Sequence, residues 1–393
     1  MTQFFGLGQM IPNFKLIKQD TSVYLFYAGQ NRKFFDDTKQ TSSLFLDLPG
    51  FQADENTFSD RDLINQSVYR ARAARRYLSR PAEHPRPRPA NEYPSLTPSI
   101  DGRLDRGFLA DSVNTEILFS EVKSGDVIII TPRSHYDPIL LGEVIGEWST
   151  DDFLVLPEFG EFSVPFRKVK WITHSLARSD FSRPVAKRMH NRRTITKIDQ
   201  NYYEDIFKLI YPRYIWGNTS KLDIFSQVYS SNDPTATGEA SFLIKYAIAL
   251  YAATLKGQVD DFVSLEKQQA AGKYFDPTIV DQMAQSFGSP GGYMARLIGT
   301  AAGMFVAAVL SIALSDESQG LAGVKQQAID ESRHQLMEVI TDEQFSPFAN
   351  SLRAGTDDEL RKTYGREAKA KLGLTLEGEV PPEVRARQSH DHD

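Results

Sequence analysis

The sequence predicts an α+β chain, in which an N-terminal β-barrel domain at residues 1–200 is followed by a mainly α-helical domain at residues 201–350. Short runs rich in β-branched and aromatic residues, bounded by Gly, Pro, Asp and Ser, fill the first half and are typical of a small barrel or curled sheet. The second half carries longer apolar stretches of good helix formers. A chain of 393 residues is also longer than one ordinary domain.

Charge is distributed unevenly along the chain. Residues 1–200 hold 27 Lys+Arg against 25 Asp+Glu, a net charge of +2, whereas residues 201–393 hold 18 against 26, a net charge of −8. The first half is therefore the better candidate for binding a polyanion. The absence of cysteine excludes disulfides, thiolate catalysis and Cys-based zinc sites. The N-terminus lacks the pattern of a signal peptide, and we expect a cytoplasmic protein.

The chain opens with a predicted strand at Val23–Tyr27, and residues 44–48 form a second strand that ends at Pro49-Gly50. Asp60–Leu78 is predicted to be a helix, and its second half is strongly basic. Its arginines lie around Tyr69 and Tyr77 and are continued by one more after the helix: Arg70, Arg72, Arg75, Arg76 and Arg80. A Pro/Arg-rich insertion follows at residues 80–105. It is either a linker or a flexible basic arm that follows phosphates.

Three further strands are predicted in the stretch that organises the first half. They are Val127–Ile130, Ile139–Trp148 and Val164–Ile172. The second of them contains Gly142 and Gly146, and glycines inside a strand usually mark a bulge, a corner or a close backbone approach.

Six sequence motifs of this half occur in a recognisable order. They are VYLFYAG, FFDD, LFLDLPGF, FSEVKSGDVIII, LGEVIGEW and FRKVKWI. In this order they resemble the PUA-like module at the N-terminus of Mrr-type restriction endonucleases and related prokaryotic defence proteins, a relative of EVE domains, over about residues 22–199. The insertion at residues 80–105 is longer than the pattern leads us to expect. The second half resembles no family that we recognise.

The resemblance implies that the module recognises a nucleic acid by holding a flipped or modified base in an aromatic pocket. Base–aromatic stacking is sequence-tolerant and contributes roughly 1–3 kcal/mol per base. We expect Tyr24, Trp148 and Trp171 to form the base-binding cage, whereas Phe26 and Phe35 are better explained as core residues. Basic residues that follow the last predicted strands are the candidates for phosphate binding: Arg167, Lys168, Lys170, Lys187, Arg188, Arg192 and Arg193.

No active site emerges from the sequence, and we expect neither an enzyme nor a cofactor. Asp111 with Glu121-Val122-Lys123 has the spacing of the acidic metal-binding motif of a nuclease, but we interpret this match as accidental because Asp111 is not placed on a strand. No metal-binding histidine pair, nucleophile elbow or phosphate-binding P-loop is present in the sequence. We therefore predict no catalytic residue and no metal site.

Residues 297–314, LIGTAAGMFVAAVLSIAL, form an uncharged stretch of eighteen residues. We interpret it as an apolar helix that either spans the inner membrane or lies in the core of a helical bundle. Small residues recur along it every four positions, which also suggests a surface for homo-oligomerisation. Residues 351–393 are expected to form a polar, partly disordered tail.

Two functions remain open. The first is a sensor of prokaryotic antiviral defence or restriction, whose N-terminal domain binds nucleic acid, preferably DNA, and whose helical half is an effector or oligomerisation domain. The second is a soluble DNA-specificity subunit that delivers a separate nuclease. Fold analogy alone does not decide between them.

Overall fold

The computed structural model describes residues 10–79, 106–134, 137–190, 193–226, 234–286 and 291–376. The chain divides into two compact units, which we call the sheet unit (residues 20–206) and the helical unit (residues 1–19 and 207–393). Residues 10–19 thus belong with the second half of the chain, although we expected them in the first domain. The insertion at residues 80–105 lies outside the described residues.

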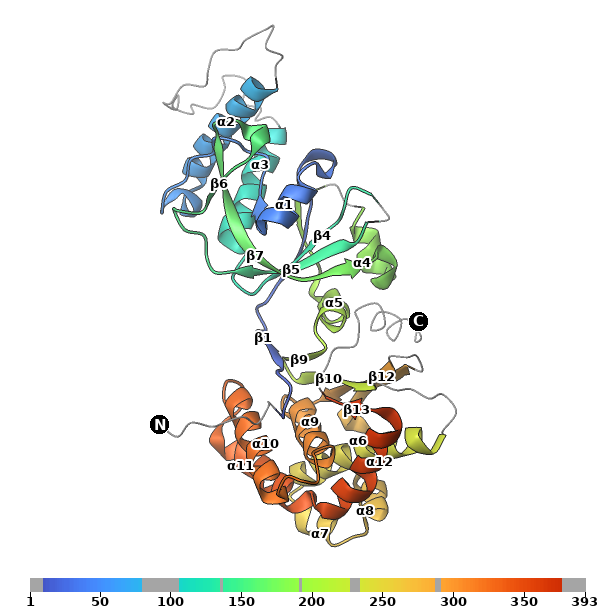
Figure 1. Cartoon of the computed structure of the whole chain (residues 1–393). Helices are drawn as coiled ribbons and strands as arrows, with labels where there is room; N and C mark the ends of the chain where they lie inside the picture. Colours follow the sequence, from blue (N-terminus) through green and yellow to red (C-terminus); the bar gives the residue numbers. More distant parts are fainter. Residues whose placement is uncertain are drawn as a thin grey trace. The chain divides into compact units, whose positions relative to one another are not determined.

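The sheet unit is built on one curled, mixed sheet (Figure 1). Within the described residues, strands β3-β7-β5-β4-β2-β8 pair in this order, and β6 pairs with β7. Strands β2 and β4 are parallel, and all the other neighbours are antiparallel. The strands are β2 (Val23–Phe26), β3 (Ser43–Phe45), β4 (Val127–Ile130), β5 (Ile139–Ile145), β6 (Phe153–Val155), β7 (Ser163–Leu176) and β8 (Ile195–Lys197). The ends of the order, β3 and β8, do not pair in the described residues, so the predicted barrel is a half-barrel.

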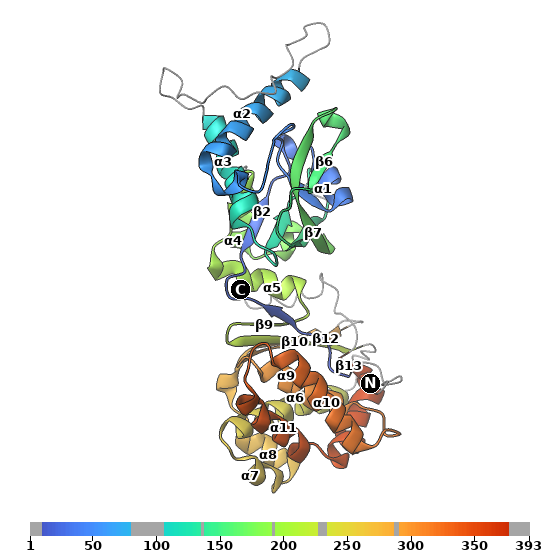
Figure 2. The ribbon, with the colours of Figure 1, turned by 90° about the vertical axis from the view of Figure 1, so that its left-hand side faces the viewer.

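Helices of the sheet unit surround this sheet, and Figure 2 shows α2 and α3 side by side. The helix predicted at Asp60–Leu78 is confirmed as α2. Asp60 is its N-cap, and the Asp60 side chain accepts a hydrogen bond from the N–H of Asp62. The helices are α1 (Phe35–Thr41), α2 (Arg61–Leu78), α3 (Arg106–Glu116) and α4 (Arg183–Arg188), with short helical turns at η1 (Gln30–Arg32), η2 (Thr57–Ser59), η3 (Ile117–Glu121), η4 (Pro157–Phe159), η5 (Arg178–Asp180) and η6 (Gln200–Tyr202).

Gly142 shows why a strand-interior glycine is needed in β5. A Cβ atom at this position would lie only 2.7 Å from Cε3 of Trp171, which packs across the neighbouring strand β7. The pairing of β5 with β7 also shifts register between Leu141 and Gly142. The strand pairing is therefore irregular at this glycine, and side chains of β7 pack against it, in agreement with the predicted bulge or close approach.

The helical unit contains a second mixed sheet, which the sequence analysis did not predict. Its order is β1-β9-β10-β12-β11, and β13 pairs with β10. The strands are β1 (Lys15–Ile17), β9 (Arg213–Trp216), β10 (Thr219–Ser226), β11 (Val280–Ser286), β12 (Gly291–Ile298) and β13 (Leu374–Thr375). Strand β1 joins β9 in parallel, and Glu331 accepts hydrogen bonds from the N–H groups of Met10 and Ile11, which fixes the start of the described chain to the helical unit.

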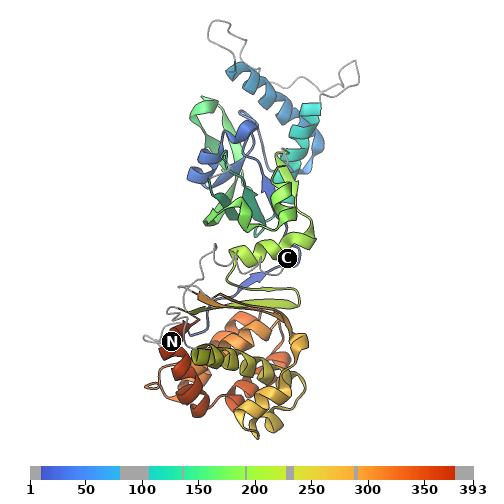
Figure 3. The same ribbon diagram turned by 90° about the vertical axis from the view of Figure 1, so that its right-hand side faces the viewer.

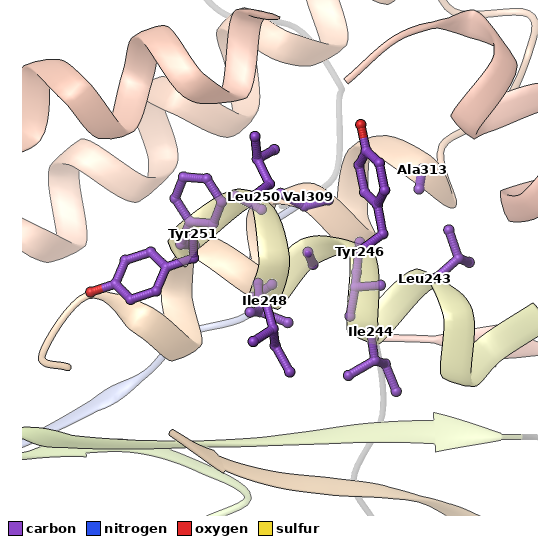
Figure 4. Packing of buried hydrophobic residues seen from close by; sticks show 14 of the residues in the cluster. Leu243, Ile244, Tyr246, Ile248, Leu250, Tyr251, Val309 and Ala313 are labelled. Atoms are coloured by element: carbon purple, nitrogen blue, oxygen red, sulfur yellow. The ribbon is translucent and has the colours of Figure 1, made fainter. Parts of the chain in front are cut away.

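Helices α6 to α12 cover one face of this sheet, as Figure 3 shows. The helices of this part of the chain are α5 (Tyr203–Ile210), α6 (Pro234–Leu255), α7 (Val259–Val263), α8 (Lys267–Tyr274), α9 (Ala302–Ala313), α10 (Leu321–Leu336), α11 (Asp342–Gly355) and α12 (Arg366–Leu372), with short turns at η7 (Pro277–Ile279) and η8 (Leu360–Gly365). In the close view of Figure 4, Ile244 and Ile248 of α6 point toward the sheet, and Tyr246 points away from it. The hydroxyl of Tyr246 donates a hydrogen bond to the carbonyl of Gly355 at 2.6 Å.

The stretch 297–314 is not one helix. Strand β12 ends at Ile298, Gly299 turns the chain at a φ of 124°, and α9 begins at Ala302. Every residue of α9 is buried, as expected for a helix wrapped by neighbours. No helix among the described residues is long and apolar enough to cross a membrane. Of the two alternatives for this stretch, the structure supports the core helix.

The small residues along α9 contact the protein's own strands and N-terminal segment. The N–H of Gly303 donates to Oγ of Ser220 at 2.8 Å, and Oγ of Ser311 donates to the carbonyl of Met10 at 2.9 Å. This ridge is therefore used within the helical unit, and it does not offer the exposed surface that we expected for homo-oligomerisation.

Residues 351–376, which we expected to belong to a polar tail, complete the helical unit. Leu360, Ala368, Leu372 and Leu374 are buried in the same core as α6 and α9. The folded chain consequently extends to at least Leu376, and only residues 377–393 of the expected tail lie outside the described residues.

We expect Phe305→Ala to lower the free energy of unfolding of the helical unit by roughly 3–5 kcal/mol, because Phe305 is buried against Tyr251 and Phe348. Urea denaturation followed by circular dichroism measures the loss. Val263→Ala on α7, where the side chain is largely exposed, is the matched control and should change stability by no more than about 0.5 kcal/mol. Equal losses for the two variants would contradict the core assignment of α9.

Candidate nucleic-acid interface

The three predicted cage residues do not form one pocket. Tyr24 is only 1% exposed and belongs to the core of the sheet unit. Burial, together with the negative charge of Asp126, raises the pKa of Tyr24 to about 12. Tyr24 is thus a core residue and has no surface on which a base could stack.

Trp148 and Trp171 lie apart, Trp148 in the segment after β5 and Trp171 on β7. Trp148 packs edge-on against Phe58, with the ring centroids 4.7 Å apart, and its buried Nε1 has no hydrogen-bond partner among the described residues. Trp171 covers Gly142, and its Nε1 donates to the carbonyl of Lys39 at 3.1 Å. Both are partly buried members of the packing around the core, and neither lines the cleft described below.

The predicted phosphate-binding residue Arg167 is also buried, with 1% of its surface exposed. Its guanidinium donates to the carbonyls of Val122 and Gly146 at 2.9 and 2.8 Å, and burial lowers its pKa. Arg167 therefore ties three parts of the sheet unit together, and its placement does not fit a phosphate contact. The neighbouring Lys168 is exposed and pairs with Asp152.

The other predicted phosphate ligands lie at the surface where the structure describes them. Lys170, Lys187 and Arg193 are exposed. Arg188 is half-buried, with its guanidinium 5.1 Å from the centre of the Tyr202 ring. Arg192 lies outside the described residues. These surface positions are compatible with binding a phosphate backbone.

A polar cleft of about 680 Å³ lies at one edge of the sheet. Its volume is within the range of about 300–1,000 Å³ that is common for ligand sites. It is lined by the loop after β2, the loop after β3, the C-terminal part of α2, helix α3 and the residue before β8: Tyr27, Gly29, Gln30, Asn31, Lys33, Leu46, Asp47, Leu48, Arg75, Arg76, Ser79, Asp111, Asn114 and Thr194.

Strand direction explains why two of these segments, the loop after β2 and the residue before β8, meet. Strand β4 is parallel to β2, and β7 runs the same way because it is antiparallel to β5, which is antiparallel to β4. Their carboxyl ends therefore lie at one edge, which is a common place for ligands in sheets with parallel strands. Strand β8 is antiparallel to β2 and starts at this edge, where the N–H of Tyr27 donates to the carbonyl of Thr194 at 2.7 Å.

The charges in the cleft form a network. Asp47 pairs with Lys33 at 2.9 Å and lies 3.9 Å from Arg75, while Asp111 accepts hydrogen bonds from Arg72 and Arg75 at 3.0 and 3.5 Å. Burial raises the pKa of Asp111 even though both arginines oppose the shift. The cleft thus presents both carboxylates and guanidiniums, the groups that hydrogen-bond the edges of a nucleobase.

The loop after β2 has an unusual backbone. Asn31 and Arg32 adopt φ angles of 56° and 57°, and Gly29 has a φ of 73°. Left-handed conformations are tolerated by Gly and Asn but cost about 1–3 kcal/mol for other residues, and such strain is concentrated at functional sites. The strained residue Arg32 places its guanidinium 4.7 Å from the centre of the Tyr27 ring, and its Nε donates to Oγ1 of Thr131 at 3.1 Å.

Asp111 and Lys123, which have the spacing of a nuclease motif in the sequence, form ion pairs with other residues in the structure. Asp111 is paired with Arg72 and Arg75, and Lys123 lies 3.6 Å from Asp20. Over the described ranges, no group of three or more His, Cys, Asp or Glu side chains is arranged to hold a metal ion.

Sequence reasoning missed most of the cleft. It identified Arg75 and Arg76 as part of a basic helix and Tyr27 as the end of the first strand. It did not predict that these residues line one cleft. The signal that was available is Ala28-Gly29 directly after the first strand, since a strand end followed by a positive-φ glycine often precedes a binding loop.

Comparison of the chain with protein-family models, with curated proteins and with solved structures finds no match.

We expect Arg167→Ala to lower the free energy of unfolding by roughly 3 kcal/mol, because it leaves two carbonyls without their buried donor. Urea denaturation of the full chain measures the change. Lys170→Ala, on the exposed side of the same strand, should cost no more than about 0.5 kcal/mol. If Arg167→Ala instead kept full stability but weakened DNA binding, Arg167 would be a phosphate ligand after all.

Proposed function

We propose that the sheet unit is a nucleic-acid recognition module in which the cleft accepts an unpaired or flipped base. The observation that carries this proposal is the convergence of two basic segments on one cleft. The arginine-rich end of α2 contributes Arg75 and Arg76, and the basic run before β8 ends at Arg193, next to the cleft residue Thr194. Phosphates would follow these segments, and the base would enter between them.

Tyr27 is the residue that we assign to base stacking. It lines the cleft and is half-buried, so part of its ring is accessible. The guanidinium of Arg32 lies over the ring and helps to fix its position. Tyr27 fits this role better than Tyr24, which is buried, and better than Trp148 or Trp171, which do not line the cleft.

The cleft has polar groups that suit the edge of a base. Asp47 and Asp111 are acceptors for an exocyclic amino group, and Asn31 and Asn114 offer both donors and acceptors. A modified base would be distinguished by the space around these groups. This is the basis for proposing modified-base recognition, in line with the implied relation to PUA-like modules.

The curled mixed sheet and the order of the six sequence motifs support a PUA-like fold for this unit. We propose on the same grounds a place in a prokaryotic defence or restriction system, with the helical unit as the effector or partner-binding part. DNA is the preferred ligand because the resembling modules accompany restriction endonucleases.

We expect Tyr27→Ala to weaken binding of single-stranded DNA by about 5- to 150-fold, which corresponds to the roughly 1–3 kcal/mol of one base stack. Fluorescence anisotropy of the full chain with labelled oligonucleotides, carrying plain or modified bases, measures the affinity over a salt series. A steep salt dependence would report phosphate contacts.

Tyr69→Ala is the matched control, since Tyr69 is a largely exposed tyrosine of α2 that does not line the cleft. It should leave the affinity within about twofold of wild type, a difference of no more than about 0.4 kcal/mol. Failure of the wild-type chain to bind any oligonucleotide, or an equal loss for both variants, would count against the proposal.

A further inference from the structure

We propose that Arg32, Arg178 and His190 form a binding site for a single phosphate group at the sheet edge beside the cleft. Neither Arg32 nor His190 was singled out as a phosphate ligand from the sequence, and none of the three residues lines the cleft itself. The site adds a defined anion position to the proposed function and rests on it only for the source of the phosphate.

The three side chains come from separate segments that end at the same edge. Arg32 follows β2 and Arg178 follows β7, whose carboxyl ends lie together, and His190 lies just before β8 begins. Nη1 of Arg178 is 3.3 Å from Nδ1 and 3.2 Å from Nε2 of His190. The fold thus gathers the three groups from distant parts of the sequence.

Both guanidiniums belong to segments that end at the same edge of the sheet, and their positive charges oppose each other. Burial lowers the pKa of Arg178, and the positive charge of Arg32 lowers it further. No carboxylate of the described chain forms an ion pair with either arginine, whereas Arg72 and Arg75 in the adjacent cleft both pair with Asp111. Because no carboxylate of the described chain offsets the positive charge of Arg32 or Arg178, an anion bound at this edge would stabilise both.

Arg32 is held in place before any ligand arrives. Its Nε donates to Oγ1 of Thr131 and its guanidinium lies over the Tyr27 ring, while its two Nη groups make no hydrogen bond to the described residues and are available as donors to an anion. A preorganised guanidinium loses little conformational entropy on binding, and its fork geometry matches phosphate oxygens. The strained backbone of Asn31 and Arg32 is explained if it serves to fix this side chain.

Tyr27 connects the phosphate site with the cleft. It lines the cleft, and the guanidinium of Arg32 lies over its ring. One nucleotide could therefore place its base in the cleft and its phosphate at the two arginines. The phosphate can belong to a nucleic-acid strand or to a free nucleotide or phosphate ion, since the chemistry that the site recognises is the same.

The test measures binding of inorganic phosphate to the full chain by ³¹P NMR, at constant ionic strength, alongside the affinity for labelled single-stranded DNA over a salt series. We expect Arg178→Gln to weaken phosphate binding about tenfold or more, since a hydrogen bond to a charged group contributes about 1.5–3 kcal/mol. The same variant should reduce the salt slope of DNA binding by about 0.7, the value for one lost contact with a single strand.

Lys39→Gln is the control for loss of one positive charge, because Lys39 is an exposed residue of α1 outside the cleft. It should alter phosphate affinity by less than about twofold. Arg178→Lys keeps the charge but loses the fork, so an intermediate loss is expected, and this variant decides the test if Arg178→Gln does not fold.

The outcomes separate this site from the proposed function. Phosphate binding that is lost in Arg178→Gln, in a chain that binds no DNA, supports the site with a free phosphate or nucleotide as its ligand and overturns nucleic-acid recognition. Phosphate binding that is absent in wild type, or equal in wild type and Arg178→Gln, overturns the site, even where DNA binding persists.

Discussion

The parallel pairing of β2 with β4 is the constraint on which the candidate interface depends. Strands β4 and β7 run in the same direction because both are antiparallel to β5, and the parallel pairing with β4 gives β2 that direction too. The loops after all three strands, and the segment before β8, then share one edge. An antiparallel β2 would bring the loop after β2, with Tyr27 and Arg32, to the opposite edge, far from Thr131 and Arg178. The shared edge is thus a consequence of strand direction, and the loops determine which side chains lie there.

Sequence reasoning predicted the sheet unit better than the helical unit, for a physical reason. The run Val127–Ile130 is apolar throughout and was found as β4, whereas β10 contains Lys221 and Asp223, which interrupt the apolar pattern of a buried strand. These two charges are buried and paired at 2.9 Å, and the ammonium of Lys221 also donates to two backbone carbonyls. A pattern method cannot foresee such a pair, because each partner alone indicates an exposed position.

The sequence-based prediction of the site residues was wrong for the same reason, because contacts between residues distant in the sequence decide which side chains are buried. Tyr24 and Tyr27 occur in one aromatic run, and only the position of the strand end decides that Tyr24 enters the core while Tyr27 reaches the cleft. Arg167 lies in a basic run with Lys168 and Lys170, yet carbonyls more than twenty residues away draw it into the interior. The clustering of positive charge was readable from the sequence, but the direction of each side chain was not.

The chain order of the helical unit has a consequence for how this protein must be made. Strand β1 precedes the whole sheet unit, but its partner β9 begins only at Arg213. During synthesis from the N-terminus, the first segment therefore waits through the emergence of nearly two hundred residues before it can pair. The sheet unit can fold in that interval as an insertion. A fragment that stops at residue 200 keeps an orphan β1, and one that starts at 207 leaves the edge of β9 open to pairing with other molecules.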